Sequence, residues 1–579
     1  MVLHLFILVC SSAVAITNRN DTENDRQALL CFKSLLSDPT QVLSSWTNTS
    51  LQFCNWHGVS CSEQLPHRAT ALDLSSGGFT GVIASCIANL TSLERLQLSN
   101  NSFHGSIPEK LGFLTKLTYL NLSMNSLDGG IPSALSSCTQ LEVLGLWNNS
   151  LQGAIPPTLS QCKNMRVINL RNNKLQGSIP ATFGILPKLH TLILEGNSLS
   201  GYIPLFWSSS SLTHVDLGSN SLSGAIPESL VNGSLQVLRL MSNMLTGELP
   251  EALFNSSSLT AICLQKNNFV GSLPKVRAIS PPLKYLSIQE NNLSGPVHSS
   301  FGNFSSLIFL SLEFNNLVGS IPESLGHIPA LETLKLTVNN LSGHVPLSIF
   351  NMSSLKFLGL GTNALTGRIP SKIGYTLPKI QTLVLQSNKF DGIIPASLMN
   401  ASQLEKIYIA YNMLTGCIPF FGSLPKLEAL HVGGNMLEAC NWGFLSSLSN
   451  CKYGLNTEIS TMGDVYSFGV LLLEMITGSR PTDEKFNDGI TLHEYVYRAF
   501  PNSVNEVIDP LLLQDETNAT DVMQNCIVPL VRVGLSCSLA SPKARWEMGK
   551  VCTEIATIKD ALSSIHGIHE PTRKGNGIT

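Results

Sequence analysis

The sequence predicts an α/β solenoid of short stacked units, followed by a short all-helical segment. Three observations predict it. Glycines recur every 23 to 25 residues from Gly105 to Gly416, and asparagines recur with them from Asn101 to Asn435. Within each unit apolar and polar residues alternate over a few positions, as in a strand with one buried face. After about residue 451 the period is lost. We expect a right-handed curved array with one parallel sheet, then separately packed helices.

The first residues are typical of a secretory signal peptide. An apolar stretch from Val2 to Val9 leads to small residues and a cleavage-like Ala13-Val14-Ala15, although only His4 could contribute positive charge before it. The alternative is an amphipathic or buried first helix. We interpret residues 1–15 as a signal peptide, which directs the chain to the secretory pathway.

Composition and cysteine spacing exclude several classes of site. Net charge is −3, so nothing in the composition suggests electrostatic binding to nucleic acid or to an acidic surface. No Cys-x-x-Cys pair occurs among the 14 cysteines, so no metal or cofactor is expected. Cys54 and Cys61 bracket Trp56 and are predicted to form a disulfide in a secreted chain. Six other cysteines are predicted to be buried or isolated thiols: Cys31, Cys86, Cys138, Cys162, Cys263 and Cys417.

The repeating unit has a recognisable pattern. One copy, "LERLQLSNNSFHGSIPEKLGFLTK", gives the template LxxLxLxxNxLxGxIPxxLxxLxx, which is that of leucine-rich repeats. The Asn is expected to hydrogen-bond main-chain groups from coil to coil. The Gly-x-Ile-Pro version resembles the plant-specific subclass, with about sixteen units over residues 70–451, the last incomplete. Residues 22–69 resemble the N-terminal cap of plant receptor ectodomains.

Asn-x-Ser/Thr sequons are frequent along the repeats. Repeats rich in Asn and Ser also create such sequons by chance, which accounts for about half of them. The predicted glycosylation sites are Asn48, Asn89, Asn100, Asn121, Asn148, Asn232, Asn255, Asn292, Asn303, Asn340, Asn351 and Asn400.

The segment after the repeats resembles part of a receptor-like serine/threonine kinase. "GDVYSFGVLLLEMITGSRPTD" is similar to a helix of the large lobe, in which the residue matching Asp464 contacts the catalytic loop. "LVRVGLSCSLASPKARWEMGKVCTEIATIKDAL" is similar to the final helices, in which the residue matching Arg545 pairs with the Glu of Ala-Pro-Glu. Here Trp546 replaces the proline that commonly follows. We interpret residues 452–565 as a partial kinase C-lobe and 566–579 as a tail.

The motifs of phosphoryl transfer are absent from this segment. We find no Gly-rich phosphate loop, strand lysine, His-Arg-Asp or Asp-Phe-Gly. No run of about 20 apolar residues separates the repeats from it. An internal deletion that joins a receptor ectodomain to a kinase tail, or a misjoined gene, explains both. We therefore predict no kinase activity, with Arg545 left unpaired and the tail loosely folded.

The resemblance implies a plant receptor of the innate-immunity type that binds a peptide or protein ligand. Solvent-facing positions beside the two leucines of each strand are the expected contact surface. The residues predicted there are Trp147, Arg171, Glu195, Arg239, Tyr285, Glu313, Phe314 and Lys335.

Three classes of function remain open. The first is a truncated receptor or secreted decoy at the cell surface or outside the cell, with a co-receptor kinase as a further partner. The second is a full receptor kinase whose membrane span and small lobe are missing from this sequence. The third is a wall protein, against which the kinase-like tail argues.

Overall fold

The computed structural model describes residues 21–49, 52–205, 211–231, 233–421, 424–438, 461–481, 483, 486, 490–514, 518–541 and 544–566. The predicted signal peptide, Asn232, the junction near residue 451 and the tail beyond His566 lie outside these ranges. Two compact units are formed, Met1–Gly367 with Leu385–Lys389, and Arg368–Val384 with Phe390–Thr579.

The N-terminal cap covers the first repeat with a helix and an antiparallel strand. Residues 21–34 are helical, and β2 (Val59–Cys61) pairs antiparallel with β3 (Ala69–Asp73). On the helix, the fully buried Asp25 accepts hydrogen bonds from the Arg68 guanidinium at 2.8 Å and from the Ala69 backbone N–H at 2.9 Å. This charged contact fixes the helix against the strand, because a buried carboxylate needs donors.

Two disulfides hold the cap. The predicted Cys54–Cys61 bridge is present. The prediction that Cys31 and Cys86 are thiols was wrong, because they form a second bridge that joins the cap helix to the first repeat. Cys417 is also disulfide-bonded, contrary to prediction. Cys138, Cys162 and Cys263 are buried free thiols, as predicted.

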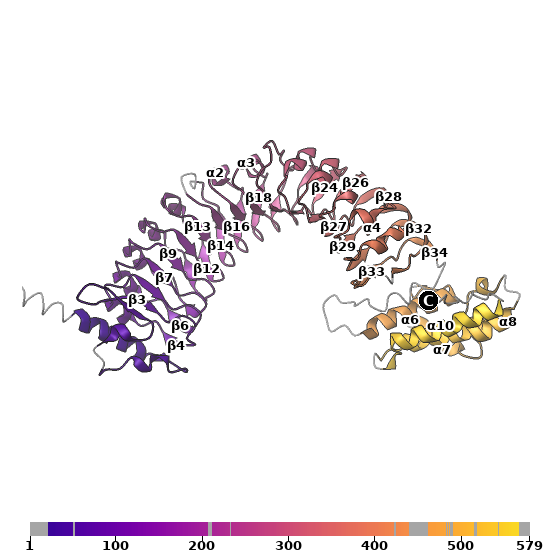
Figure 1. Cartoon of the computed structure of the whole chain (residues 1–579), viewed down its shortest axis with the longest axis horizontal. Coiled ribbons are helices and arrows are strands. Elements are labelled where there is room, and N and C mark those ends of the chain that lie inside the picture. The colour runs from indigo at the N-terminus through magenta and orange to yellow at the C-terminus, as the bar shows by residue number, and fades with distance from the viewer. Residues whose placement is uncertain are drawn as a thin grey trace, which may run out of the picture. The chain divides into compact units, whose positions relative to one another are not determined.

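The repeats of the first unit build one long parallel sheet, which we call the inner sheet. In Figure 1, α2 (Glu228–Val231) and α3 (Glu251–Asn255) lie on the outer side of the curve. After β3 the strands are β5 (Arg95–Gln97), β7 (Tyr119–Asn121), β9 (Val143–Gly145), β11 (Val167–Asn169), β13 (Thr191–Ile193), β15 (His214–Asp216), β17 (Val237–Arg239), β19 (Ala261–Cys263), β21 (Tyr285–Ser287), β23 (Phe309–Ser311), β25 (Thr333–Lys335) and β27 (Phe357–Gly359).

The register of the inner sheet places equivalent residues side by side. Leu96 pairs with Leu120, which pairs with Leu144, and each is fully buried. Since side chains alternate along a strand, the residues on either side of these leucines face solvent. The leucines of one repeat cannot be buried alone, so stacking creates the continuous core.

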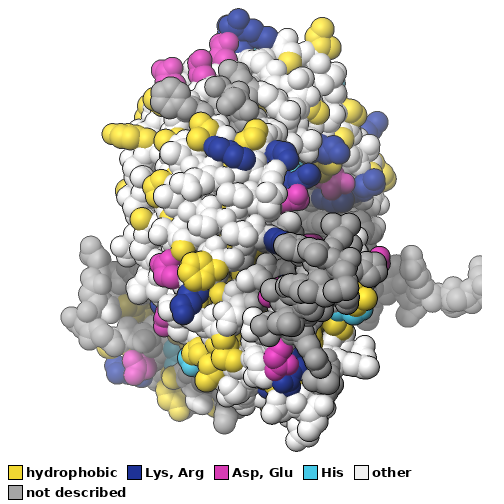
Figure 2. Space-filling model, turned by 90° about the vertical axis from the view of Figure 1, so that its left-hand side faces the viewer, with side chains coloured by type: hydrophobic (Ala, Val, Ile, Leu, Met, Phe, Trp, Pro, Cys, Tyr) yellow, Lys and Arg dark blue, Asp and Glu magenta, His cyan; other side chains and the backbone are white. Residues whose placement is uncertain are grey.

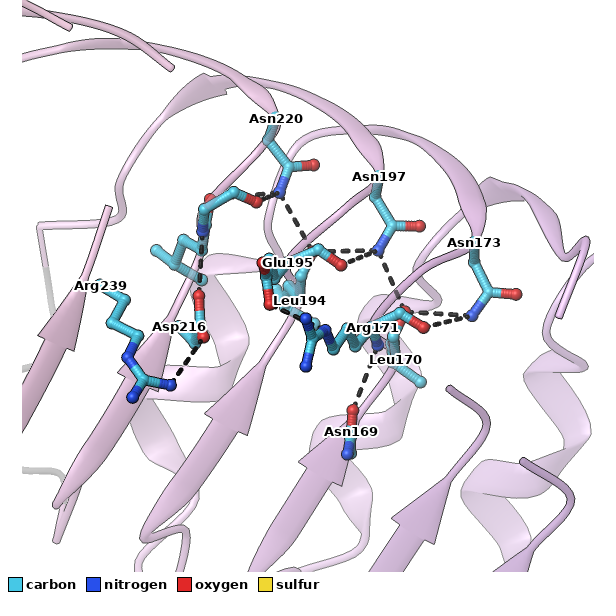
Figure 3. A network of polar contacts seen from close by, with 12 residues as sticks. Asn169, Leu170, Arg171, Asn173, Leu194, Glu195, Asn197, Asp216, Asn220 and Arg239 are labelled. Carbon is cyan, nitrogen blue, oxygen red and sulfur yellow. Dashed lines mark hydrogen bonds and ion pairs between the residues drawn. The ribbon is translucent and has the colours of Figure 1, made fainter. Parts of the chain in front are cut away.

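The recurring asparagine connects neighbouring coils as predicted. Asn173 donates from Nδ2 to the carbonyls of Leu170 at 3.1 Å and Leu146 at 3.0 Å, while its Oδ1 accepts from Leu151 N–H at 3.0 Å. Asn197 and Asn220 repeat the arrangement (Figure 3). Each side chain therefore satisfies turn groups in its own coil and in the preceding one.

A second set of short strands, which we call the far-side strands, and a series of short helices complete the coils. The strands are β1 (Leu36–Ser37), β4 (Thr80–Val82), β6 (Ser102–Ser106), β8 (Ser126–Asp128), β10 (Gln152–Ala154), β12 (Lys174–Gly177), β14 (Ser198–Tyr202), β16 (Ser221–Gly224), β18 (Met244–Gly247), β20 (Asn268–Phe269), β22 (Ser294–Pro296), β24 (Asn316–Gly319), β26 (Asn340–His344) and β28 (Ala364–Arg368). The 3₁₀ helices of the cap and first unit are η1 (Val42–Ser45), η2 (Phe53–Asn55), η3 (Ser85–Asn89), η4 (Glu109–Phe113), η5 (Ser133–Ser137), η6 (Pro157–Gln161), η7 (Ala181–Ile185), η8 (Ser299–Asn303), η9 (Glu323–His327) and η10 (Ile349–Asn351).

The second unit contains more repeat elements and a helical segment. Its repeat elements are α4 (Ile373–Thr376), β29 (Thr382–Val384), β30 (Lys389–Ile393), η11 (Ala396–Asn400), β31 (Lys406–Tyr408), β32 (Met413–Cys417), β33 (Ala429–His431) and β34 (Met436–Glu438). The helical elements are α6 (Thr461–Thr477), α7 (Leu492–Ala499), η15 (Val504–Glu506), η16 (Pro510–Leu513), α8 (Ala519–Val522), the π-helix η17 (Met523–Ile527), α9 (Val528–Cys537) and α10 (Met548–Ile565). The predicted solenoid with a helical C-terminal segment is confirmed.

The helical segment has an apolar core of its own. Val465 and Leu473 of α6 pack with Val531 of α9 and Val551 of α10. Arg545 is half-buried and donates to the carbonyls of Leu539 at 2.7 Å and Ala540 at 3.1 Å. The prediction that this arginine is unpaired was therefore wrong, because backbone carbonyls satisfy it. The side chain of Asp464 lies outside the described residues.

Candidate functional site

The solvent-facing side of the inner sheet, which we call the inner face, gathers most of the predicted contact residues. It consists of the residues immediately before, between and after the two buried leucines of each strand. Parallel pairing lines up equivalent positions, so that Asp216 pairs with Arg239 on the next strand. These side chains contribute little to the core, so their chemistry is free to vary without loss of the fold.

Four charged residues form a row across neighbouring strands at one part of this face (Figure 3). Arg171 Nε lies 2.8 Å from Glu195 Oε2, and Arg239 lies 3.5 Å from Asp216 Oδ2. The two arginines are half-exposed, whereas the carboxylates are mostly covered. Figure 3 shows the acidic side chains between the two guanidinium groups. We call Arg171, Glu195, Asp216 and Arg239 the charged row.

Burial sets the acidity of the two carboxyl groups in the charged row. It raises the pKa of Glu195, and the charge of Asp216 raises it further, while Arg171 and Arg239 act in the opposite direction. Burial also raises the pKa of Asp216, which is 7% exposed, against a hydrogen bond from Gly218 N–H and the two arginines. Asp216 was missed from sequence, although it occupies the same kind of position as Arg239.

Aromatic residues form a second group on the inner face. We call Tyr285, Phe309 and Phe357, together with the neighbouring Glu313 and Lys335, the aromatic row. The rings of Tyr285 and Phe309 stack with centroids 4.2 Å apart and planes 7° apart. Lys335 Nζ lies 4.7 Å from the ring centroid of Phe357 and 3.7 Å from Glu313 Oε2. The structure thus brings together the predicted Tyr285, Glu313 and Lys335. Sequence reasoning missed Phe309 and Phe357, which lie at equivalent positions.

The remaining two predicted residues belong to neither row. Trp147 is half-buried and follows β9, the strand that pairs with β11, at the position equivalent to Arg171. Phe314 is 50% exposed and has φ of 53°, so it lies in the left-handed turn before Asn315 and not beside the strand leucines. The predicted set therefore comprises two clusters, one residue beside the charged row and one residue in a turn.

The described residues contain neither a metal-binding cluster nor a membrane-spanning helix. Among them, no group of His, Cys, Asp and Glu has the composition to hold a metal ion. None of the helices in the described part of the chain has the length and apolar character needed to cross a bilayer.

Family descriptions match the repeat region. The leucine rich repeat N-terminal domain matches residues 22–62, and the leucine rich repeat matches residues 67–127, 139–199, 211–232 and 281–341.

Relatives and solved structures agree with these matches. Receptor kinase-like protein Xa21 of Oryza sativa subsp. japonica is 38% identical over 127 residues, which are 21% of this chain and 12% of Xa21. The plant peptide hormone receptor RGFR1 in complex with RGF2 has a TM-score of 0.59 and 33% identity, over 62% of this chain and 57% of that chain.

A third similar protein is the ectodomain of the plant membrane receptor kinase GASSHO1/SCHENGEN3 from Arabidopsis thaliana, in complex with CASPARIAN STRIP INTEGRITY FACTOR 2. It has a TM-score of 0.53 and 30% identity, over 74% of this chain and 63% of that chain. The matched segments span only about one tenth of the length of the first curated relatives. The chain is a leucine-rich repeat protein, with a leucine-rich repeat N-terminal domain, whose relatives are plant leucine-rich repeat receptor-like kinases.

Proposed function

We propose that this protein binds an extended peptide on the inner face of its repeats, between β11 and β27. The observation that carries the proposal is the placement of the charged and aromatic rows on one face of one sheet. Their side chains stand at positions that the core does not use. Interfaces for peptides commonly combine aromatic contacts with a few charged partners.

The spacing of the strands sets the size of the ligand. Eight inter-strand steps separate β11 from β27, which at about 4.8 Å each is about 38 Å. An extended chain rises about 3.3 Å per residue, so about twelve residues would span both rows. A peptide of this length would place polar or charged side chains over Arg171 and Glu195, and apolar side chains over Tyr285 and Phe309.

The cellular role follows from the compartment and the relatives. Two disulfides in the cap favour an oxidising compartment, since such bridges are rare in the cytosol. Extracellular or cell-surface perception of a peptide, in signalling or defence, is the role that suits such a surface. RGFR1, a plant peptide hormone receptor, was solved in complex with RGF2, which supports the same class of ligand here. A co-receptor kinase is a further partner in this proposal.

The proposal includes no enzymatic activity of this chain. It would act as a truncated receptor or a secreted decoy, unless a longer product restores a membrane span and the kinase small lobe. A wall protein remains the third possibility, and the kinase-like helices after residue 461 argue against it.

Selection of random dodecamers displayed on phage, against the full secreted protein, tests the proposal. Tyr285→Asn creates Asn-Leu-Ser on β21 and so adds a glycan to the aromatic row, whereas Tyr285→Gln changes the same residue without a sequon. Selection on the wild-type protein should enrich a set of peptides. The Tyr285→Asn variant should recover these peptides far less than the Tyr285→Gln variant does. Equal recovery by both variants would place the contact surface elsewhere.

A further inference from the structure

The inner face carries one glycosylation sequon on its strands, at Asn121 on β7. Four of the predicted sites in the described residues are the last residues of short helices: Asn89, Asn303, Asn351 and Asn400. Two others belong to the far-side strands, since Asn340 begins β26 and Asn292 lies just before β22. Asn100 and Asn148 lie in left-handed turns that follow inner strands, with φ of 57° and 56°. From β11 to β27 no Asn-x-Ser/Thr falls on an inner strand.

The geometry points to Asn121 as a glycosylated residue whose glycan covers the inner face around β7, before the peptide stretch begins. Its Oδ1 accepts a hydrogen bond from Ser123 N–H at 3.1 Å. Nδ2 has the Tyr119 hydroxyl as its partner at 3.5 Å, which is beyond the usual length of such a bond. The acceptor nitrogen is thus available in the folded protein.

The neighbouring strand accommodates the Asn121 amide on the inner face. Asn121 pairs with Gly145 on β9, and a Cβ at Gly145 would lie 2.9 Å from Asn121 Oδ1. Because Gly145 has no side chain, the amide fits against β9 in this position. Two polar atoms near Asn121 are buried with no hydrogen-bond partner in the described part of the protein. One is Oε1 of Gln97 on the neighbouring strand β5, and the other is Oγ of Ser123, two residues after Asn121. These atoms lie beneath the surface, so this part of the inner face is polar and suits an apolar peptide side chain poorly.

Asn255 provides a contrast on the outer side of the repeats. Its Nδ2 donates to the carbonyls of Glu251 at 2.9 Å and Lys275 at 3.2 Å, and its Oδ1 accepts from Arg277 N–H and Ala278 N–H. Both amide hydrogens are therefore in use. A glycan at this residue would replace one of them and break a bond that holds the 275–278 segment, so we expect the folded protein to carry none there.

The modification is a group transfer from a lipid-linked oligosaccharide diphosphate. A bond forms between Asn121 Nδ2 and the anomeric carbon of the oligosaccharide, and the bond from that carbon to the diphosphate oxygen breaks. One amide proton leaves the nitrogen, and the lipid diphosphate is released. The sequon Asn121-Leu122-Ser123 supplies the acceptor.

A glycan at Asn121 would divide the inner face into two parts. Asn100, Asn121 and Asn148 all precede β11, so the covered part includes Tyr119 and the surroundings of Trp147. The free part carries the charged and aromatic rows. That the free part receives a peptide rests on the proposed function, whereas the glycan at Asn121 does not depend on it.

Enzymatic removal of N-glycans in H₂¹⁸O, followed by peptide mass spectrometry, tests the acceptor in full-length protein secreted from plant cells. Occupied asparagines become ¹⁸O-labelled aspartates. Label at Asn121, with none at Asn255, is expected. An unlabelled Asn121, or higher occupancy of Asn255 than of Asn121, would overturn the inference whether or not a peptide ligand is ever found.

Hydroxyl-radical footprinting tests the coverage without any ligand. Asn121→Gln and Ser123→Ala both remove the sequon, and Ser123→Ala leaves Asn121 in place and only deletes a buried hydroxyl. Oxidation of Tyr119 and Trp147 should rise severalfold in both variants, while oxidation of Tyr285 stays unchanged. Unchanged oxidation of Tyr119 and Trp147 would show that the inner face around β7 is not covered.

Discussion

Arg171 and Glu195 form an ion pair across neighbouring strands, with Nε and Oε2 2.8 Å apart. The guanidinium is half-exposed, so the pair contributes only about 0–1 kcal/mol to stability. Its effect is therefore mainly on recognition, since it fixes the position of both charges on the inner face. A ligand that approaches this face meets an oriented guanidinium and a carboxylate together. Figure 2, in which the left-hand side of Figure 1 faces the viewer, shows basic and acidic side chains close to one another on the surface.

Asp216→Asn is expected to change the pH dependence of unfolding. Burial raises the folded-state pKa of Asp216, so its favourable contribution is complete below about pH 4 and is lost as pH rises through the folded value. The amide of the Asp216→Asn variant does not titrate, so its contribution to stability does not change as pH rises. The thermal midpoint of the variant minus that of wild type should therefore increase from pH 4 to pH 7. Glu195, Arg171 and Arg239 are the same in both proteins, so this difference reports on residue 216.

Asp73→Asn supplies the control for that measurement. Asp73 stands at the equivalent position on β3, accepts a hydrogen bond from the N–H two residues on at 3.0 Å, and is exposed. A midpoint difference that falls with pH for Asp216→Asn, or an equal trend in both variants, would contradict the effect of burial.

Asn315→Ala is expected to destabilise the repeats. The buried Asn315 donates to the carbonyls of Ile288, Leu312 and Glu313 at 3.1–3.2 Å, and accepts from Leu293 N–H at 3.1 Å. Its removal leaves several buried groups unsatisfied, at a cost of about 2–4 kcal/mol. A lower thermal midpoint and faster hydrogen exchange at Leu293 should result.

The adjacent Asn316 offers a matched comparison, because it is exposed at the start of β24. Asn316→Ala should leave the midpoint and the exchange rate at Leu293 almost unchanged. Similar losses in the two variants would show that the hydrogen bonds of Asn315 to the preceding coil add no stability beyond that of the local turn.

The sequence could predict features that repeat with the period of the coil. Alternation around Leu144 and its equivalents defined the core and the inner face, and the Asn173 type of contact recurs because each coil meets the next in the same way. Contacts between unlike side chains of neighbouring coils carry no such period. The Tyr285–Phe309 stack and the Asp216–Arg239 pair depend on which residues happen to meet, so only their positions could be predicted.

Long-range contacts were the least predictable. Cys31 and Cys86 are 55 residues apart, and only the docking of the cap helix brings them together. Arg545 was predicted to be unpaired because the Glu that it would pair with in receptor-like kinases is absent. In the folded protein it bonds instead to the carbonyls of Leu539 and Ala540. In both cases the decisive geometry arises from packing and not from local sequence.

The two cap disulfides are expected to differ in their contributions to stability. A cross-link removes more chain entropy when it closes a longer loop. The Cys31–Cys86 loop spans 55 residues and the Cys54–Cys61 loop spans 7. The entropy relation gives about 4 kcal/mol for the first and about 2 kcal/mol for the second. Thermal unfolding of the two double-alanine variants, with free thiols counted by alkylation, should show the larger loss without Cys31–Cys86. Equal losses would mean that loop length does not govern this cap.

Full-length protein is expected to show neither ATP binding nor autophosphorylation. Catalysis of phosphoryl transfer depends on positioning and on charge stabilisation by a phosphate-binding lysine, metal-holding carboxylates and a catalytic base. The segment that we interpret as a partial kinase C-lobe contains Asp464 and Arg545, and Arg545 is bonded to carbonyls of its own loop. Incubation with Mg²⁺ and labelled ATP should give no labelled protein, and ATP should not shift the thermal midpoint. A midpoint shift that grows with ATP concentration, and persists in Arg545→Met, would show that the helices after residue 461 form a nucleotide site that the motifs do not predict.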